Sequence, residues 1–207
     1  PETTGNQSID YFISSKLIEL ENSQKRYSEK IICSNSLPMF YYQPQIKKKL
    51  NIKQTSQTNL YSCPQTLFKL HPDFDKIIEG IQKQDKSSII FFIKDSNKIF
   101  YKIFINRVKK NSNINLDKIK FIEGLNWEEY INHCGEASVL LDPLYFGAGN
   151  SFYESMFYGT PTISMPTEYT KSRLVLGGYN QMNISDLNFN PITASIDEYV
   201  NKAVETA

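Results

Sequence analysis

The feature that most constrains the fold of this 207-residue chain is an alternation, from residue 59 onward, of short apolar runs and amphipathic stretches. The run at 88–93 (SIIFFI) is unbroken, as expected for a strand covered on both faces of a parallel sheet. The predicted strands are 59–62, 88–93, 118–122, 137–141 and 162–165, and the predicted helices are 71–83, 98–110, 127–134 and 151–158. Right-handed crossovers between such units predict an α/β fold: a Rossmann-like parallel sheet with helices on both faces and a ligand site at the carboxyl ends of the strands.

The part of the chain before residue 57 has a different character. Residues 9–14 are β-branched and aromatic enough to predict a short strand, and residues 15–26 predict a helix. Residues 21–56 are polar and irregular, which indicates a connecting region. We therefore expect two parts, a connector at 1–56 and a Rossmann-like lobe at 57–207.

Composition excludes several classes of function. The 23 Lys and Arg residues against 22 Asp and Glu residues give a net charge of +1, which favours neither a nucleic-acid partner nor an anionic membrane. No apolar run approaches the roughly 18 residues of a membrane-spanning helix. Three cysteines without CxxC spacing support neither a disulfide framework nor a zinc site, so we expect a reducing, cytoplasmic location. Because the chain starts at Pro1 without a secretory signal, we expect it to be a piece of a longer polypeptide.

The most informative segment is 142–161 (DPLYFGAGNSFYESMFYGTP), which runs from a strand end through a glycine loop into a helix. Gly147 and Gly149 could take positive φ and let backbone amides approach a phosphate at the helix start. Asn150 and Ser151 would then donate to a diphosphate, and Glu154, one turn later, would accept from ribose hydroxyls. The alternative is structural, because tight turns also use glycine and Ser151 with Glu154 has the spacing of a capping box. The residues alone leave both open.

Residues 142–161, together with 170–182 (TKSRLVLGGYNQM), resemble the carboxyl-terminal catalytic lobe of the O-linked N-acetylglucosamine transferase family, including bacterial relatives that follow tetratricopeptide repeats. The likeness extends to 4–13 (TGNQSIDYFI), 27–30 (YSEK), 62–72 (SCPQTLFKLHP) and 121–142, and so covers nearly the whole chain. It implies the second, nucleotide-sugar-binding lobe of a two-lobed GT-B glycosyltransferase, with no metal and no other cofactor. The missing first lobe and repeats would be partners within the same polypeptide.

The resemblance also implies roles for individual residues. Lys69 matches the family's lysine that contacts the donor diphosphate, and it would stabilise the charge of the leaving group. Gln65 and Thr66 would reach phosphate or sugar, and Gly149, Asn150, Ser151 and Glu154 would hold phosphates and ribose. Backbone groups at Leu125 would read the nucleobase, and Tyr130 would pack against it. His133 departs from the family, which has a cationic residue there, and as an isolated histidine it is expected at a surface or helix end.

The activity implied by the resemblance is inverting transfer of N-acetylglucosamine from its uridine diphosphate donor to a Ser or Thr hydroxyl of a protein. The general base would lie outside this segment, so the chain alone would bind nucleotide weakly and catalyse little. Two alternatives stay open. One is a protein O-fucosyltransferase that uses guanosine diphosphate fucose. The other is a non-catalytic interaction lobe, which would be favoured by the departures at His133 and at Asn150, where the resembled family has a hydroxyl-bearing residue.

Overall fold

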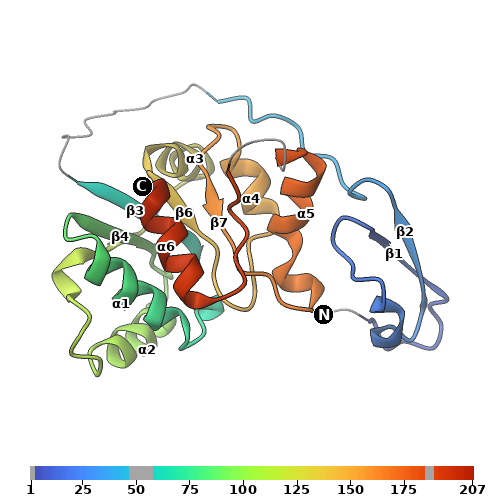
Figure 1. The fold of residues 1–207 in the computed structure, drawn as a ribbon, viewed down its shortest axis with the longest axis horizontal. Helices are drawn as coiled ribbons and strands as arrows, with labels where there is room; N and C mark the ends of the chain where they lie inside the picture. The colour runs from blue at the N-terminus through green and yellow to red at the C-terminus, as the bar shows by residue number, and fades with distance from the viewer. Residues whose placement is uncertain (1–2, 47–57, 185–188) are drawn as a thin grey trace.

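A computed structural model describes residues 3–46, 58–184 and 189–207 of the chain (Figure 1). Within these residues a five-stranded sheet has the order β5-β4-β3-β6-β7, and all of its neighbouring strands are parallel. Its strands are β3 (Asn59–Thr66), β4 (Ser88–Ile93), β5 (Ile119–Ile122), β6 (Val139–Leu141) and β7 (Thr162–Ile163). The five strands predicted from the sequence are therefore present, although β3 is longer and β7 shorter than predicted.

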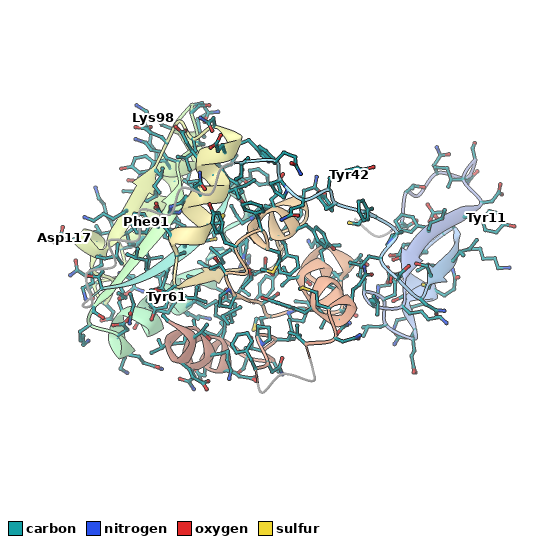
Figure 2. The ribbon with its side chains drawn as sticks, turned by 90° about the horizontal axis from the view of Figure 1, so that it is seen from above. Tyr11, Tyr42, Tyr61, Phe91, Lys98 and Asp117 are labelled. Atoms are coloured by element: carbon teal, nitrogen blue, oxygen red, sulfur yellow. The ribbon has the colours of Figure 1, made fainter. Side chains whose placement is uncertain are left out.

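Helices cover both faces of this sheet. The helices are α1 (Phe74–Gln84), α2 (Ile99–Val108), α3 (Trp127–Glu136), α4 (Asn150–Ser155), α5 (Leu174–Gln181) and α6 (Ile196–Thr206). Helices α1 and α6 pack side by side on one face, and α3 lies on the other (Figures 1 and 2). Four of the helices confirm the predicted ones, with α4 ending several residues earlier than predicted.

The sequence analysis did not predict α5 and α6. Helix α5 contains Gly177 and Gly178 in succession, which lowers its intrinsic helix propensity. A Cβ at Gly177 would lie 2.6 Å from Ile18 Cγ1, and one at Gly178 would overlap Phe152 Cε1. Close packing on both sides therefore stabilises α5 against its local preference. Helix α6 carries an ordinary start signal, because the Ser195 side chain accepts from the Glu198 amide.

The main core lies between the sheet and helices α1, α2 and α6. Ile90 and Phe92 of β4 point into it, while Phe91 on the opposite face contacts the His133 ring. Both faces of β4 are therefore covered, as its unbroken apolar run predicted. A smaller cluster of Cys134, Ala137 and Leu140 packs α3 onto the other face.

The amino-terminal part corrects two expectations. Strand β1 (Tyr11–Ser15) confirms the predicted strand, but 15–26 forms only a 3-10 turn, η1 (Ser23–Arg26), because Ser14, Ser15 and Glu19 hold a turn through side-chain hydrogen bonds. The region expected to be irregular contains β2 (Lys30–Ser34), which pairs in parallel with β1. Residues 47–57 of that region lie outside the described residues.

This amino-terminal unit contacts the larger lobe along α5. The Arg173 guanidinium donates to the Ile18 carbonyl, Asn180 donates to the Leu17 carbonyl, and the Leu37 amide donates to Gln181. Among the described residues no helix is long and apolar enough to cross a membrane, and all three cysteines are free.

Candidate functional site

The candidate site lies where β3 and β6 end side by side. The chain leaves β3 toward β4 on one side and leaves β6 toward β7 on the other, so the direction of winding changes between these two strands. Loops that diverge at such a point leave a crevice at the carboxyl edge of a parallel sheet. Two segments carry most of the predicted residues: 64–69 spans the end of β3 and the turn after it, and 142–151 follows β6.

The end of β3 is irregular, and this irregularity brings Lys69 to the crevice. The pairing register of β3 with β4 shifts between Cys63 and Thr66, where Pro64 has no amide to contribute. A 3-10 turn, η2 (Leu67–Lys69), follows, and the buried side chains of Leu67 and Leu70 anchor it. Lys69 is thus held at the edge by apolar residues on either side of it.

The Lys69 ammonium is oriented by two neutral acceptors. It donates to Gln65 Oε1 at 2.8 Å and to the Gly147 carbonyl at 3.1 Å, and it lies 4.5 Å from the centre of the Phe146 ring. Burial lowers the pKa of Lys69, and the negative charge of Asp142 opposes this shift. Because an ammonium has three N–H donors, one is left for a ligand. Lys69 forms no salt bridge to any residue that the structure describes.

Gln65 connects Lys69 to the start of α4. Its side chain is 7 % exposed, and its Nε2 donates to Ser151 Oγ at 2.6 Å. Helix α4 begins after Gly149 without a side-chain cap, and the Glu154 carboxylate accepts from Trp127 Nε1 at 3.1 Å instead. The capping-box interpretation of Ser151 and Glu154 is therefore wrong, because both side chains interact across the crevice with other elements.

The glycine loop differs from its prediction. Neither Gly147 nor Gly149 has positive φ in the structure. The amide of Gly147 donates to the Lys171 carbonyl, and the amide of Ala148 donates to Asp142 Oδ1 at 2.6 Å, so neither faces a ligand. Gly147 is required for space, since a Cβ there would lie 2.8 Å from Asp142 Oδ2.

The side predicted to hold a nucleoside is formed by the start of α3. Asn126 and Glu129 make a reciprocal capping box, which fixes the first turn and leaves the Trp127 ring about half exposed. The Tyr130 hydroxyl donates to the Pro64 carbonyl at 3.1 Å, and burial raises the pKa of Tyr130. Leu125 is half-buried in the loop before the helix, after Gly124 with a φ of 74°.

His133 lies in the last turn of α3, as one of its two expected settings had it, but it is not a surface residue. Its Nε2 lies 2.8 Å from Ser62 Oγ, and its ring packs edge-on against Phe91 of the sheet. Burial lowers the pKa of His133 to about 4, so the ring is neutral at physiological pH. It therefore cannot supply the cationic contact of the resembled family.

The structure thus joins Gln65, Lys69 and Ser151 in one hydrogen-bonded chain and places Glu154 against Trp127. Thr66 and Asn150 are exposed beside them. A cavity of about 10 Å³ between the two strand ends has room for at most one water, so a larger ligand would lie on the outside of the crevice. Whether these residues bind a donor stays a prediction.

Sequence reasoning did not identify Asp142 as a residue of this site. It is 4 % exposed at the end of β6, and burial raises its pKa to about 6. Its position in the sequence could have identified it, because an aspartate directly after a buried apolar strand lies at the carboxyl end of that strand, where ligands bind in parallel sheets. None of the described residues form a group of three or more side chains suited to holding a metal ion.

No protein-family model and no curated protein matches this sequence. Among solved structures, a mutant of the Thermobaculum terrenum O-GlcNAc transferase is similar with a TM-score of 0.85 and 13% identity, over 99% of this chain and 38% of that one. A mutant of S. aureus TarM scores 0.44 at 10% identity, covering 91% of this chain and 43% of that one. Pneumococcal O-GlcNAc transferase GtfA, in complex with UDP and GlcNAc, scores 0.40 at 12% identity, covering 95% and 41%.

The likeness to the Thermobaculum transferase establishes the fold. It confirms the predicted Rossmann-like lobe of GT-B architecture and extends over both the amino-terminal unit and the larger lobe. This chain spans only 38% of the length of that transferase.

Proposed function

We propose that this chain is the donor-binding lobe of a nucleotide-sugar glycosyltransferase, and that its donor is UDP-N-acetylglucosamine. The observation that carries the proposal is the Lys69 ammonium at the point where the strand order diverges, held by Gln65 and Gly147 with one donor to spare. The similarity of this chain's fold to that of an O-GlcNAc transferase supports UDP-N-acetylglucosamine as the donor.

Sugar transfer from a nucleotide donor is favoured by a positive group beside the diphosphate. As the bond from the anomeric carbon to the diphosphate breaks, negative charge develops on the leaving nucleoside diphosphate. An ammonium that is already oriented in a partly buried site stabilises this charge without reorganisation. We propose that Lys69 does so without a metal, and that Ser151 and Asn150 add hydrogen bonds to the phosphates, with Gln65, Thr66 and Gly149 beside them.

The nucleoside would lie between α3 and α4. Glu154 accepts one hydrogen bond from Trp127 and has further acceptor capacity on its two oxygens, which suits the ribose hydroxyls. Tyr130 and the half-exposed Trp127 ring offer aromatic surface for the base. Leu125 follows the sharp turn at Gly124, where its backbone groups would meet the edge of the base.

The acceptor in this proposal is a Ser or Thr hydroxyl of a protein, which attacks the anomeric carbon opposite the leaving diphosphate and so inverts it. The group that removes the hydroxyl proton would come from parts of the polypeptide beyond this lobe, as would the acceptor site. The chain by itself would therefore bind the donor with little turnover.

Calorimetric titration of the chain with UDP tests whether Lys69 and Glu154 bind the donor nucleotide. Lys69→Ala and Glu154→Ala should each weaken binding by about tenfold, because each removes a charged hydrogen-bonding group. The matched control is Lys83→Ala, which removes an equal charge from the exposed last turn of α1 and should leave affinity unchanged. GDP serves as the competing nucleotide.

Each result separates the candidate functions. Preference for UDP, with losses confined to the two site variants, supports the proposal. Preference for GDP would contradict the UDP-sugar donor and favour GDP-fucose instead. Failure to bind either nucleotide, repeated with a longer form of the protein that contains the first lobe, would favour the non-catalytic interaction lobe.

A further inference from the structure

We propose that Asp142 is a positioning residue for Lys69, and that it acts through the single peptide group between Gly147 and Ala148. The N–H of this peptide donates to Asp142 Oδ1 at 2.6 Å, and the C=O of the same peptide accepts from the Lys69 ammonium at 3.1 Å. A peptide group is planar, and its N–H and C=O point in opposite directions. Fixing the N–H therefore fixes the direction of the carbonyl that holds Lys69.

Asp142 is itself held from several sides. Its Oδ2 accepts from Ser164 Oγ at 2.6 Å, directly after β7, and its own carbonyl accepts from the Tyr199 hydroxyl of α6 at 3.0 Å. The carboxylate thus ties the ends of β6 and β7 and the glycine loop together. No rotation of Asp142 is possible without breaking one of these bonds, which makes it a rigid support for the loop.

The groups that face Asp142 explain why its role is positional. Lys69 and Cys63 lie on the side of β3, and the Tyr179 and Tyr199 hydroxyls face it from α5 and α6. Of these only Lys69 carries a charge. Asp142 attracts this charge but forms no direct ion pair with it, so the hydrogen-bonded connection between the two side chains runs through the peptide.

The absence of a side chain at Gly147 is needed for the hydrogen bond between this peptide and Asp142. A Cβ there would contact both carboxylate oxygens of Asp142, at 2.8 and 3.0 Å. Only glycine lets the peptide approach the carboxylate this closely. The aspartate, the glycine and the lysine therefore form one unit built from three different segments of the chain.

This inference rests on the proposed function for its consequence in donor binding, and a double-mutant cycle tests it. Calorimetry with UDP compares Asp142→Ala, Lys69→Ala and the double variant. We expect about a tenfold loss for each single change and no further loss in the double variant, since Asp142 would act only through Lys69. Asp142→Asn should retain wild-type affinity, because an amide oxygen still accepts from the Ala148 N–H and its NH₂ donates to Ser164.

Asp85→Ala is the matched control for loss of a buried carboxylate. Asp85 is 8 % exposed and accepts hydrogen bonds from Asn59, Tyr61 and Ser87. It lies just before β4, at the amino ends of the strands and so away from the candidate site. Its loss should lower thermal stability without coupling to Lys69. Additive losses for Asp142→Ala and Lys69→Ala, or equal coupling for Asp85→Ala, would overturn the inference.

A ligand-free measurement separates this inference from the proposed function. The ammonium protons of Lys69 should give a resolved NMR signal in the wild-type chain and in Asp142→Asn, and lose it in Asp142→Ala. If UDP fails to bind but this pattern holds, the proposed function fails and the positioning role stands. If UDP binds but the Lys69 signal is the same in all variants, the positioning role fails alone.

Discussion

At the scale of single residues, partner atoms decide roles that residue types leave open. Ser151 and Glu154 have the spacing of a capping box, yet their oxygens accept from Gln65 and Trp127, which come from other parts of the chain. His133 has the sequence surroundings of a surface residue, yet it packs between α3 and the sheet. Only the folded arrangement distinguishes these possibilities.

The buried ring of His133 should titrate at a lower pH than an ordinary histidine. Its pKa of about 4 lies below the ordinary value near 6.5, so the folded state prefers the neutral ring. This preference stabilises the fold fully above pH 6.5, and the stabilisation is lost as the pH falls toward 4. The measurement is an NMR titration of a His71→Gln variant, in which His133 is the only histidine left of the two in the sequence. A midpoint near 6.5 would contradict the burial of the ring.

At the scale of elements, glycines mark where helices approach other elements closely. Gly80 in α1 faces Val200 of α6, and Gly177 in α5 faces Ile18 of the amino-terminal unit. Both glycines lie inside helices, where alanine has the higher intrinsic propensity. Their presence shows that packing between elements outweighs local preference at these positions.

Gly80→Ala tests this balance. The added Cβ would lie 2.7 and 2.9 Å from the two methyl carbons of Val200, a β-branched and 3 % exposed side chain that cannot easily rotate away. We expect a loss of about 1–3 kcal/mol in the free energy of unfolding, as for other overpacked cores. Urea denaturation measures it, and combining Gly80→Ala with Val200→Ala should relieve the overpacking. An increase in stability for Gly80→Ala alone would show that helix propensity dominates.

At the scale of the whole molecule, the amino-terminal unit and the larger lobe meet through polar contacts along α5 and the turn before it. The Arg173 guanidinium donates to the Ile18 carbonyl and to the Thr167 carbonyl at 3.1 Å. Glu19 accepts from the Thr170 hydroxyl at 3.1 Å, and hydrogen bonds from Tyr27 and other hydroxyls counter the effect of burial and lower its pKa. These polar contacts accompany the apolar packing of Ile18 and Leu37 against Gly177.

Arg173→Ala should loosen this attachment. Removing the guanidinium leaves the Ile18 carbonyl without its donor, so amides at 11–34 should exchange with deuterium faster while the amides of β3 and β4 keep their protection. Lys171→Ala removes an exposed charge two residues away and serves as the control. Unchanged exchange at 11–34 in the Arg173 variant would mean that the apolar contacts of Ile18 and Leu37 suffice.

The sequence by itself determined the parallel sheet, because unbroken apolar runs of strand length between amphipathic helices can be buried in few other ways. It also indicated a candidate site at 142–154, from the glycine loop between a buried strand and a helix, and the resemblance to a known family added 64–69. It did not determine β2 or α5, whose stability depends on partners distant in the chain. The orientation of Lys69 by Gln65, Gly147 and Asp142 was decided by tertiary structure alone, since a hydrogen bond needs two atoms placed within about 3 Å and residue order does not specify that distance.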